Sequence, residues 1–329
     1  MPRVLVLGAT GYLGQSVTQS LVRSGLHDVY GICRSSSKAK ILAAIEVSPV
    51  ISEDPANAPE PFLAAIRRSN IDVVVDCAAA YGDSAKLLAH VTKAGKERLD
   101  AFKAEDITSP PRLGYVYVSG GWVHGDSDRL VSDLDPVGTA SAATKPLDIV
   151  AWRPELERAV LASRDVLDVL IFRPAQMYGR SSSAWGALWG PLANGIKDGK
   201  SSITVPAPPN SQSPVIHVDD IADAISLGVG KISLLGGTSV YPVFDVVSST
   251  ENIRDVIDAF AKALLADEGK SSDLKFDFVG PGDDVYLKAL TATVRCNSSR
   301  ARELLGWEPK RVGLVSKMEV YAGAWKAGQ

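Results

Sequence analysis

The sequence predicts an α/β fold in which a doubly wound parallel sheet is joined to a smaller, discontinuous C-terminal part. Short β-branched runs alternate with helical stretches through the first half of the chain, as in successive βαβ units. The run 73–75 consists of three valines and the run 169–172 is also apolar without alternation, which is typical of strands covered on both faces. A Gly-rich turn joins the first expected strand to the first expected helix.

The expected elements follow from these runs in chain order. Strands are predicted at 3–7, 29–33, 47–51, 72–76, 115–119, 166–172 and 243–247. Helices are predicted at 12–24, 61–69, 84–102, 149–162, 252–265 and 299–305, and a strand followed by a helix at 215–227. Gly25 follows the first helix and is a plausible left-handed terminator.

Beyond residue 172 the composition changes, because residues 173–214 are rich in Gly, Ser, Pro and Trp. We therefore expect a sheet domain formed by residues 1–172 and 215–250. Residues 173–214 and 251–329 are expected to form the smaller domain that closes over it.

Composition limits the classes of function. Of the 329 residues, 46% are hydrophobic and 22% charged, as in a globular protein. The net charge is -3, and no stripe of basic residues in the sequence suggests nucleic-acid binding. No apolar run is long enough to cross a bilayer, and no signal peptide precedes the first strand. The three cysteines are widely spaced and suggest no metal site. We expect a cytoplasmic protein with no nucleic-acid, membrane or metal partner.

The turn after the first strand has glycines spaced for a phosphate-binding loop. Gly8 permits a tight turn, Gly11 allows the backbone to approach a pyrophosphate, and Gly14 allows the helix to pack closely on the strand. The helix N-terminus would present N–H groups and a positive dipole end to the phosphates. A structural Gly-rich turn without a ligand is the alternative. The expected contacts to a dinucleotide are Gly8, Thr10, Gly11, Tyr12, Leu13 and Gly14.

The residues after the second strand favour NADP(H) over NAD(H). An acid at this point would bind the adenosine ribose hydroxyls. This chain instead has Arg34, followed by Ser35 and Lys38, which suit a 2′-phosphate. A charge-assisted hydrogen bond contributes about 1.5–3 kcal/mol. A solvated loop arginine is the alternative interpretation.

Six segments resemble the extended short-chain dehydrogenase/reductase family, the NAD(P)-dependent epimerase/dehydratase group. They are VLVLGATGYLG (4–14), VVVDCAAA (73–80), YVYVSGGWVHG (115–125), IFRPAQMYG (171–179), VIHVDDIADAI (215–225) and LLGWEP (304–309). The resemblance implies a Rossmann domain, a small substrate domain and a site in the cleft between them. It also implies that Ala78 and Ala79 lie beside the adenosine and that Pro174 and Met177 pass the nicotinamide.

The chain departs from this family at the catalytic residues. The family's chemistry uses a serine or threonine together with a tyrosine and a lysine in a YxxxK motif. Alignment on Glu157 puts Arg153 at the lysine position and Ile149 at the tyrosine position. Arg153 could still hold the nicotinamide ribose, but it cannot lose a proton at working pH. Ser119, or Gly120 after a one-residue slip, occupies the serine position. Loss of a general acid costs roughly 10²–10⁴ in rate.

Other side chains are candidates to carry the proton in place of the tyrosine. His124 titrates near neutral pH and follows a strand that faces the expected cleft, although a packing role is an alternative. Tyr178 follows the nicotinamide segment and Tyr81 follows the fourth strand, while Trp122 is a candidate shape element. The predicted catalytic set is Ser119, His124, Arg153 and Tyr178.

The expected substrate is small. Trp185 and Trp189 suggest an apolar or aromatic pocket, and core packing is an equal alternative. Arg180 and Lys197 leave open a second substrate class, the nucleotide sugars, whose diphosphate they could bind. Three functions follow. The first is an atypical NADP-dependent oxidoreductase or epimerase-like enzyme acting on a small carbonyl or alcohol. The others are a non-redox isomerase, lyase or cyclase on the same scaffold, and a non-catalytic NADP(H)-sensing protein. A homodimer is the favoured assembly, with a monomer as the alternative.

Overall fold

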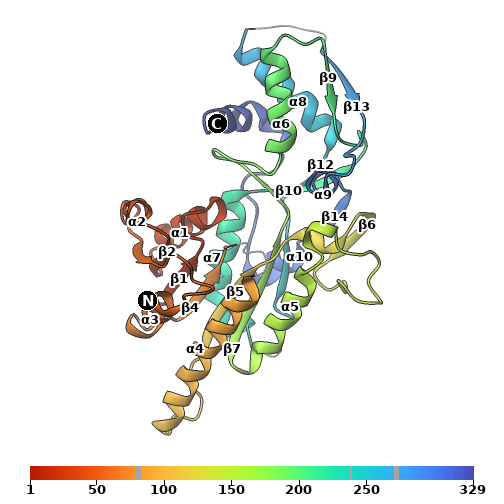
Figure 1. Cartoon of the computed structure of the whole chain (residues 1–329). Coiled ribbons are helices and arrows are strands. Elements are labelled where there is room, and N and C mark those ends of the chain that lie inside the picture. The colour runs from red at the N-terminus through yellow and green to blue at the C-terminus, as the bar shows by residue number, and fades with distance from the viewer. Residues whose placement is uncertain (79–82, 238, 270–273) are drawn as a thin grey trace.

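A parallel seven-stranded sheet forms the centre of the protein (Figure 1). The computed structural model describes residues 1–329 except 79–82, 238 and 270–273. The strand order β11-β7-β5-β4-β1-β2-β3 changes direction between β1 and β4, as in a Rossmann fold. The predicted fold class is therefore confirmed. The strands are β1 (Arg3–Leu7), β2 (Asp28–Cys33), β3 (Ser48–Ile51), β4 (Val73–Asp76), β5 (Leu113–Val118), β7 (Leu167–Pro174) and β11 (Val243–Val246).

Helices cover both faces of the sheet, which explains why the central strands are apolar throughout. Val4 and Val6 of β1 pack with the helices of one face, and Leu5 and Leu7 pack with those of the other. One layer contains α1 (Tyr12–Ser24), α2 (Ser36–Ala43), α7 (Val218–Leu235) and α10 (Ser299–Leu305). The opposite layer contains α3 (Glu60–Arg68), α4 (Ser84–Ala104) and α5 (Arg153–Ala162).

The smaller part has an apolar core of its own. Trp189 stacks on Phe260 with ring centroids 4.6 Å apart, and Trp325 meets both rings edge-on. This core is built from α6 (Gly186–Lys197), α8 (Ile253–Asp267), α11 (Met318–Lys326) and the parallel pair β9 (Ser202–Val205) and β13 (Lys275–Phe278). Figure 1 shows these elements grouped beyond the carboxyl edge of the large sheet.

Short strands connect the two parts. A three-stranded sheet has the order β12-β10-β8, and its strands are β8 (Gln176–Tyr178), β10 (Gln212–His217) and β12 (Ser249–Asn252). A parallel pair joins β6 (Ser127–Ser132) to β14 (Val294–Asn297), and the short helix α9 (Val285–Leu290) precedes β14. None of the described helices is both long and apolar enough to span a membrane.

The predicted division of the chain differs from the packing at one element. Residues 251–329 were assigned to the smaller domain, but α10 lies in the α1/α7 layer of the sheet. Its Ala301 and Leu305, with the following Trp307, are at most 1% exposed and belong to the same apolar cluster as β1. The Trp307 indole Nε1 also donates to the Asp220 carbonyl of α7 at 2.8 Å.

The structure also differs from the sequence prediction at two helices. The helix expected at 149–162 begins at Arg153, because Pro154 has no N–H to donate to the carbonyl of Val150 and so ends the regular ladder. A short 3₁₀ turn, Asp148–Val150, replaces the missing turn. Helix α2 was not predicted, although Ser35 caps it by accepting the Lys38 backbone N–H at 3.3 Å.

Candidate functional site

The turn after β1 is as tightly packed as its three glycines suggested. Gly8 has φ +74°, and a Cβ on it would lie 2.9 Å from the Cα of Ala78, which follows β4. A Cβ on Gly14 would lie 2.0 Å from the Gly8 carbonyl oxygen. Side chains at these positions would push apart β1, α1 and the β4 turn. The structure thus brings together Gly8, Gly14 and Ala78, whereas Ala79 and Tyr81 lie outside the described residues.

The N-terminus of α1 faces this turn without a side-chain cap. Gly11 is the N-cap residue, its own N–H donates to the Gly8 carbonyl at 2.9 Å, and the first helical turn contains no acid. The uncapped N–H groups and the helix dipole therefore favour an anion. Leu13 is 7% exposed and its side chain packs in the core, so only its backbone can serve a ligand.

Arg34 lies at the carboxyl end of β2. Its side chain is exposed and makes no ion pair with any other residue that the structure describes. The hydroxyl of Ser35 is used in the α2 cap, and Lys38 is exposed one turn further on. Arg34 is thus a cation available at the end of β2, where selection between a free adenosine ribose and a 2′-phosphate is expected.

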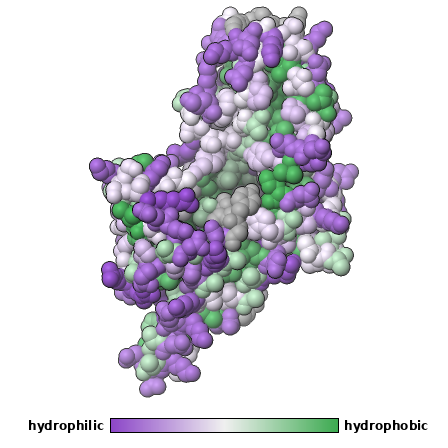
Figure 2. All heavy atoms as spheres, in the orientation of Figure 1, coloured by the Kyte–Doolittle hydropathy of each residue, from purple (hydrophilic) through white to green (hydrophobic). Residues whose placement is uncertain are grey.

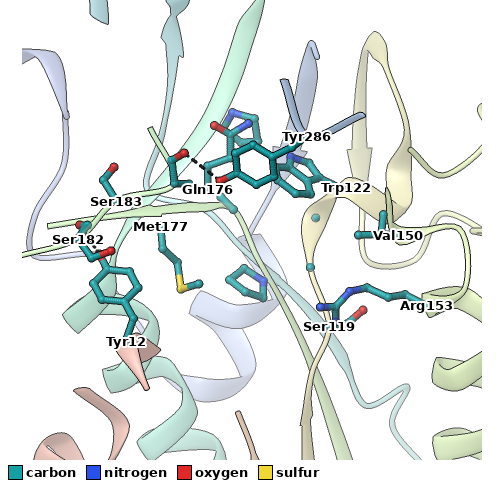
Figure 3. A pocket seen from close by; sticks show the side chains of 16 residues that line it. Tyr12, Ser119, Trp122, Val150, Arg153, Gln176, Met177, Ser182, Ser183 and Tyr286 are labelled. Atoms are coloured by element: carbon teal, nitrogen blue, oxygen red, sulfur yellow. Dashed lines mark hydrogen bonds between the residues drawn. The ribbon is translucent and has the colours of Figure 1, made fainter. Parts of the chain in front are cut away.

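A cavity of about 350 Å³ lies where the carboxyl edge of the sheet faces the smaller part. Figure 2 shows the surface hollowed in this region. Five predicted site residues line the cavity, namely Tyr12, Ser119, Arg153, Pro174 and Met177. In Figure 3, Tyr12 and Met177 approach from one side and Ser119 and Arg153 from the other.

Ser119 is held by a buried charged network. Its Oγ donates to Glu157 Oε1 at 2.5 Å, and Arg173 Nη2 donates to Glu157 Oε2 at 2.5 Å. These three residues are at most 5% exposed. Because the Ser119 hydrogen is used by the carboxylate, its oxygen can only accept a further hydrogen bond in this arrangement.

Arg153 contributes positive charge to the cavity wall. Its Nη1 donates to the Tyr117 hydroxyl and to the Val118 carbonyl, both at 3.1 Å, while its Nε is buried without a partner among the described residues. Burial raises the pKa of Tyr117 above its ordinary value despite the opposing charge of Arg153, so this phenol stays neutral. Val150 also lines the cavity. It lies one position after Ile149, the residue that the sequence alignment put at the family's tyrosine position.

The structure contradicts a cavity-facing role for His124. The side chain is 2% exposed, and its Nε2 lies 2.7 Å from Asp245 Oδ2 of β11. It does not line the cavity. Cys296 completes a cluster in which one ligand-type atom of each residue lies within 4.8 Å of the others. This cluster could not be foreseen, because its members come from segments far apart in the sequence.

Tyr178 also points away from the cavity. It is fully buried, its hydroxyl donates to the Arg311 carbonyl at 3.0 Å, and its ring packs edge-on against Tyr321. The prediction rested on proximity along the chain: the adjacent Met177 lines the cavity, but the Tyr178 ring lies in the core of the smaller part. Trp185 and Trp189 are likewise at most 1% exposed in the core of the smaller part, which favours the packing alternative for both.

Several cavity residues were not predicted from the sequence, and two of them have large side chains. Tyr286 of α9 lines the cavity, and its ring meets Trp122 edge-on with centroids 5.9 Å apart. Gln176 of β8 also lines it and is 5% exposed. Gln176 lies beside Met177 inside a quoted motif and could have been suspected from that position. Tyr286 carried no comparable signal, since it lies about seventy residues or more from every other residue that lines the cavity.

Comparisons with known proteins agree with this geometry. Residues 4–94 match the model of the "NAD dependent epimerase/dehydratase family". No curated protein sequence matches the chain. Similar solved structures include a dTDP-glucose 4,6-dehydratase from Bacillus anthracis in complex with NAD (TM-score 0.71, 15% identity, 100% of this chain and 98% of that chain). A UDP-glucose 4-epimerase from Stenotrophomonas maltophila with bound NAD is also similar (TM-score 0.67, 19% identity, 99% and 98%). At these identities the likeness establishes the fold.

Proposed function

We propose that the chain belongs to the NAD-dependent epimerase/dehydratase family and is an atypical NADP(H)-dependent oxidoreductase acting on a small carbonyl or alcohol. The observation that carries the proposal is the loop of Gly8, Gly11 and Gly14 beneath an uncapped helix N-terminus, with Arg34 at the end of the next strand. The family match over residues 4–94 covers this loop, strand β1 from residue 4 onward, and strand β2 with Arg34 after it.

The residues present fit a dinucleotide. The close approach of Gly8 to Gly14 leaves backbone N–H groups of α1 for a pyrophosphate, and no acid lies in the first turn to repel it. The exposed guanidinium of Arg34 would hold a 2′-phosphate, and the absence of an acid at this point of the sequence disfavours an unsubstituted ribose. The solved relatives named above contain NAD, so the preference for NADP(H) rests on Arg34 alone.

The cofactor would supply hydride exchange, and the chain would supply positioning and charge. The loop from Gly8 to Gly14 and Arg34 would hold the cofactor, which would exchange a hydride with the substrate carbon, and the proton of an alcohol substrate would pass to solvent. The Arg153 guanidinium would stabilise the negative charge on the substrate oxygen during this exchange. The hydrogen of Ser119 is held by Glu157, so this side chain would serve the site as a fixed acceptor. The family's tyrosine–lysine pair would not take part, because Ile149 and Arg153 stand at its two positions in the sequence.

Hydride exchange can be followed through NADPH absorbance with a panel of small ketones and aldehydes. The proposal predicts NADPH oxidation by the wild-type protein and a fall of about 10²–10³ in kcat for Arg153→Gln, in line with the loss of one charge-stabilising donor. Lys197→Ala, at an exposed position outside the cavity, is the matched control and should leave kcat unchanged. Turnover of substrate without any change in NADPH absorbance would favour the non-redox alternative. Tight NADPH binding without turnover would favour the sensing alternative.

A further inference from the structure

Beside Arg153, whose Nε also lacks a partner among the described residues, the cavity has two further buried polar groups left unpaired by that part of the chain. Gln176 Oε1 and Trp122 Nε1 each have no hydrogen-bond partner among the described residues, and both side chains line the cavity. Buried polar atoms are nearly always paired in native proteins, so each of these atoms indicates a group that arrives from outside the chain.

The Gln176 amide has a defined orientation. Its Nε2 donates to the Leu290 carbonyl at 2.9 Å, and only an N–H can make that bond. The unpartnered atom is therefore the amide oxygen, which requires a donor from the ligand. The Trp122 Nε1 is a donor and requires an acceptor. A hydroxyl group has both capacities.

The surrounding wall is aromatic. Trp122 and Tyr286 meet at 82° with ring centroids 5.9 Å apart, and the Tyr286 hydroxyl is anchored by donating to the Ala184 carbonyl at 2.9 Å. Figure 3 shows both rings above the cavity, between Gln176 and Val150. Such a wall favours contact with a ring.

The wall provides little positive charge for a diphosphate. Among the described lining residues Arg153 is the one cation, and one of its nitrogens is already used by Tyr117 and Val118. Arg180, a candidate for a nucleotide-sugar phosphate, pairs instead with Asp219 at 2.7 Å. The negative charges of a diphosphate would therefore be buried with a single guanidinium to compensate them.

We propose that this cavity selects an uncharged, ring-bearing alcohol, with Gln176 and Trp122 binding the hydroxyl and the Trp122–Tyr286 wall contacting the ring. A cavity of about 350 Å³ is at the small end for ligand pockets, which limits the ligand to one or two rings. The inference rests on the proposed function, since it names the substrate class of the same site.

Calorimetric titration of the full chain tests the inference with 1-phenylethanol, ethylbenzene, phenylacetate and UDP, each with and without saturating NADP⁺. We expect 1-phenylethanol to bind about tenfold more tightly than ethylbenzene, which lacks the hydroxyl, because an unpaired buried acceptor is then left behind. In Gln176→Leu this ratio should fall to about twofold or less, whereas in Lys197→Ala it should stay unchanged.

Two outcomes would overturn the inference. One is UDP or phenylacetate binding more tightly than 1-phenylethanol, and the other is a ratio that is unchanged in Gln176→Leu. Trp122→Phe, which keeps the aromatic wall and removes only the donor, should also lower the ratio, and it provides a second test if Gln176→Leu fails to fold. The titrations without NADP⁺ keep this test separate from the cofactor proposal. Failure to bind NADP⁺ would contradict the proposed function, while the alcohol-to-hydrocarbon ratio still decides the ligand class.

Discussion

Glu157 links the predicted site to the core at the scale of a single residue. Its carboxylate accepts the Ser119 hydroxyl on the cavity side and two nitrogens of Arg173 on the interior side. With an exposure of 3%, it depends on these partners to compensate for lost hydration. Glu157 therefore positions Ser119. Glu157 is itself held in place by its ion pair with Arg173 of strand β7.

Replacing Glu157 by glutamine would leave the Arg173 charge buried with little compensation. We expect Glu157→Gln to lower the free energy of unfolding by about 3–5 kcal/mol, as measured by urea denaturation. Glu60→Gln is the control, because Glu60 also pairs with an arginine, Arg67, but is 73% exposed. This control should change stability by less than about 1 kcal/mol. Equal effects of the two substitutions would show that burial does not decide the importance of the Glu157 pair.

The roles of single residues could be predicted from the sequence where those roles depend on the local backbone conformation. Gly8 and Gly14 were identified because a tight turn between a strand and a helix needs them. His124 and Tyr178 were placed in the cleft by their proximity to motifs, but the partners that bury them, Asp245 and Tyr321, come from distant segments. Side-chain direction at such positions depends on tertiary packing, which one sequence does not reveal.

At the scale of elements, the junction between β10 and α7 depends on a neutral histidine. His217 is the N-cap residue of α7, and its Nδ1 accepts the Asp219 backbone N–H at 3.1 Å. Burial lowers the pKa of His217 to about 4, and the nearby Arg311 charge acts in the same direction. A protonated Nδ1 could not accept this bond, so the helix start favours the neutral ring.

The depressed pKa of His217 predicts that the protein is less stable in acid. The ordinary histidine pKa is about 6.5 in the unfolded chain. The unfolded state therefore takes up a proton below pH 6.5 and the folded state does not do so until about pH 4. This stability is present above pH 6.5 and is lost as pH falls to 4, by about 3 kcal/mol from this residue. Urea unfolding between pH 7 and 4 measures it. His217→Asn, which keeps a capping side chain, should show a shallower pH dependence, and an identical dependence would contradict this account.

Helix α7 offers a second, matched test of packing. A Cβ on Gly228 would lie 2.6 Å from Cζ of Phe172 in β7, whereas a Cβ on Gly230 would meet nothing within 4 Å. We expect Gly228→Ala to destabilise the protein by about 1–3 kcal/mol through overpacking. Gly230→Ala, at an exposed helical position, should stabilise it by about 0.5–1 kcal/mol. Midpoints of urea denaturation give both values, and effects of the same sign would show that α7 does not pack on β7 as described.

At the scale of the whole molecule, the large sheet could be predicted and the smaller part could not. Buried parallel strands have long apolar runs, and right-handed βαβ connections leave few possible orders for them. The strands β8, β9, β12, β13 and β14 are only three or four residues long, and they pair with segments far away in the chain. Such strands have no periodic signal of their own, and the cavity wall contributed by α9 was visible only in the structure.

The proposed function depends on a dinucleotide bound at the edge of this sheet, with its extra phosphate held by Arg34. Fluorescence titration of the purified chain with NADPH and with NADH tests it most directly. The account predicts that NADPH binds about ten- to a hundredfold more tightly than NADH, and that Arg34→Ala abolishes the difference. Binding of neither nucleotide would contradict the claim, and equal affinity for the two in the wild-type protein would contradict the role of Arg34.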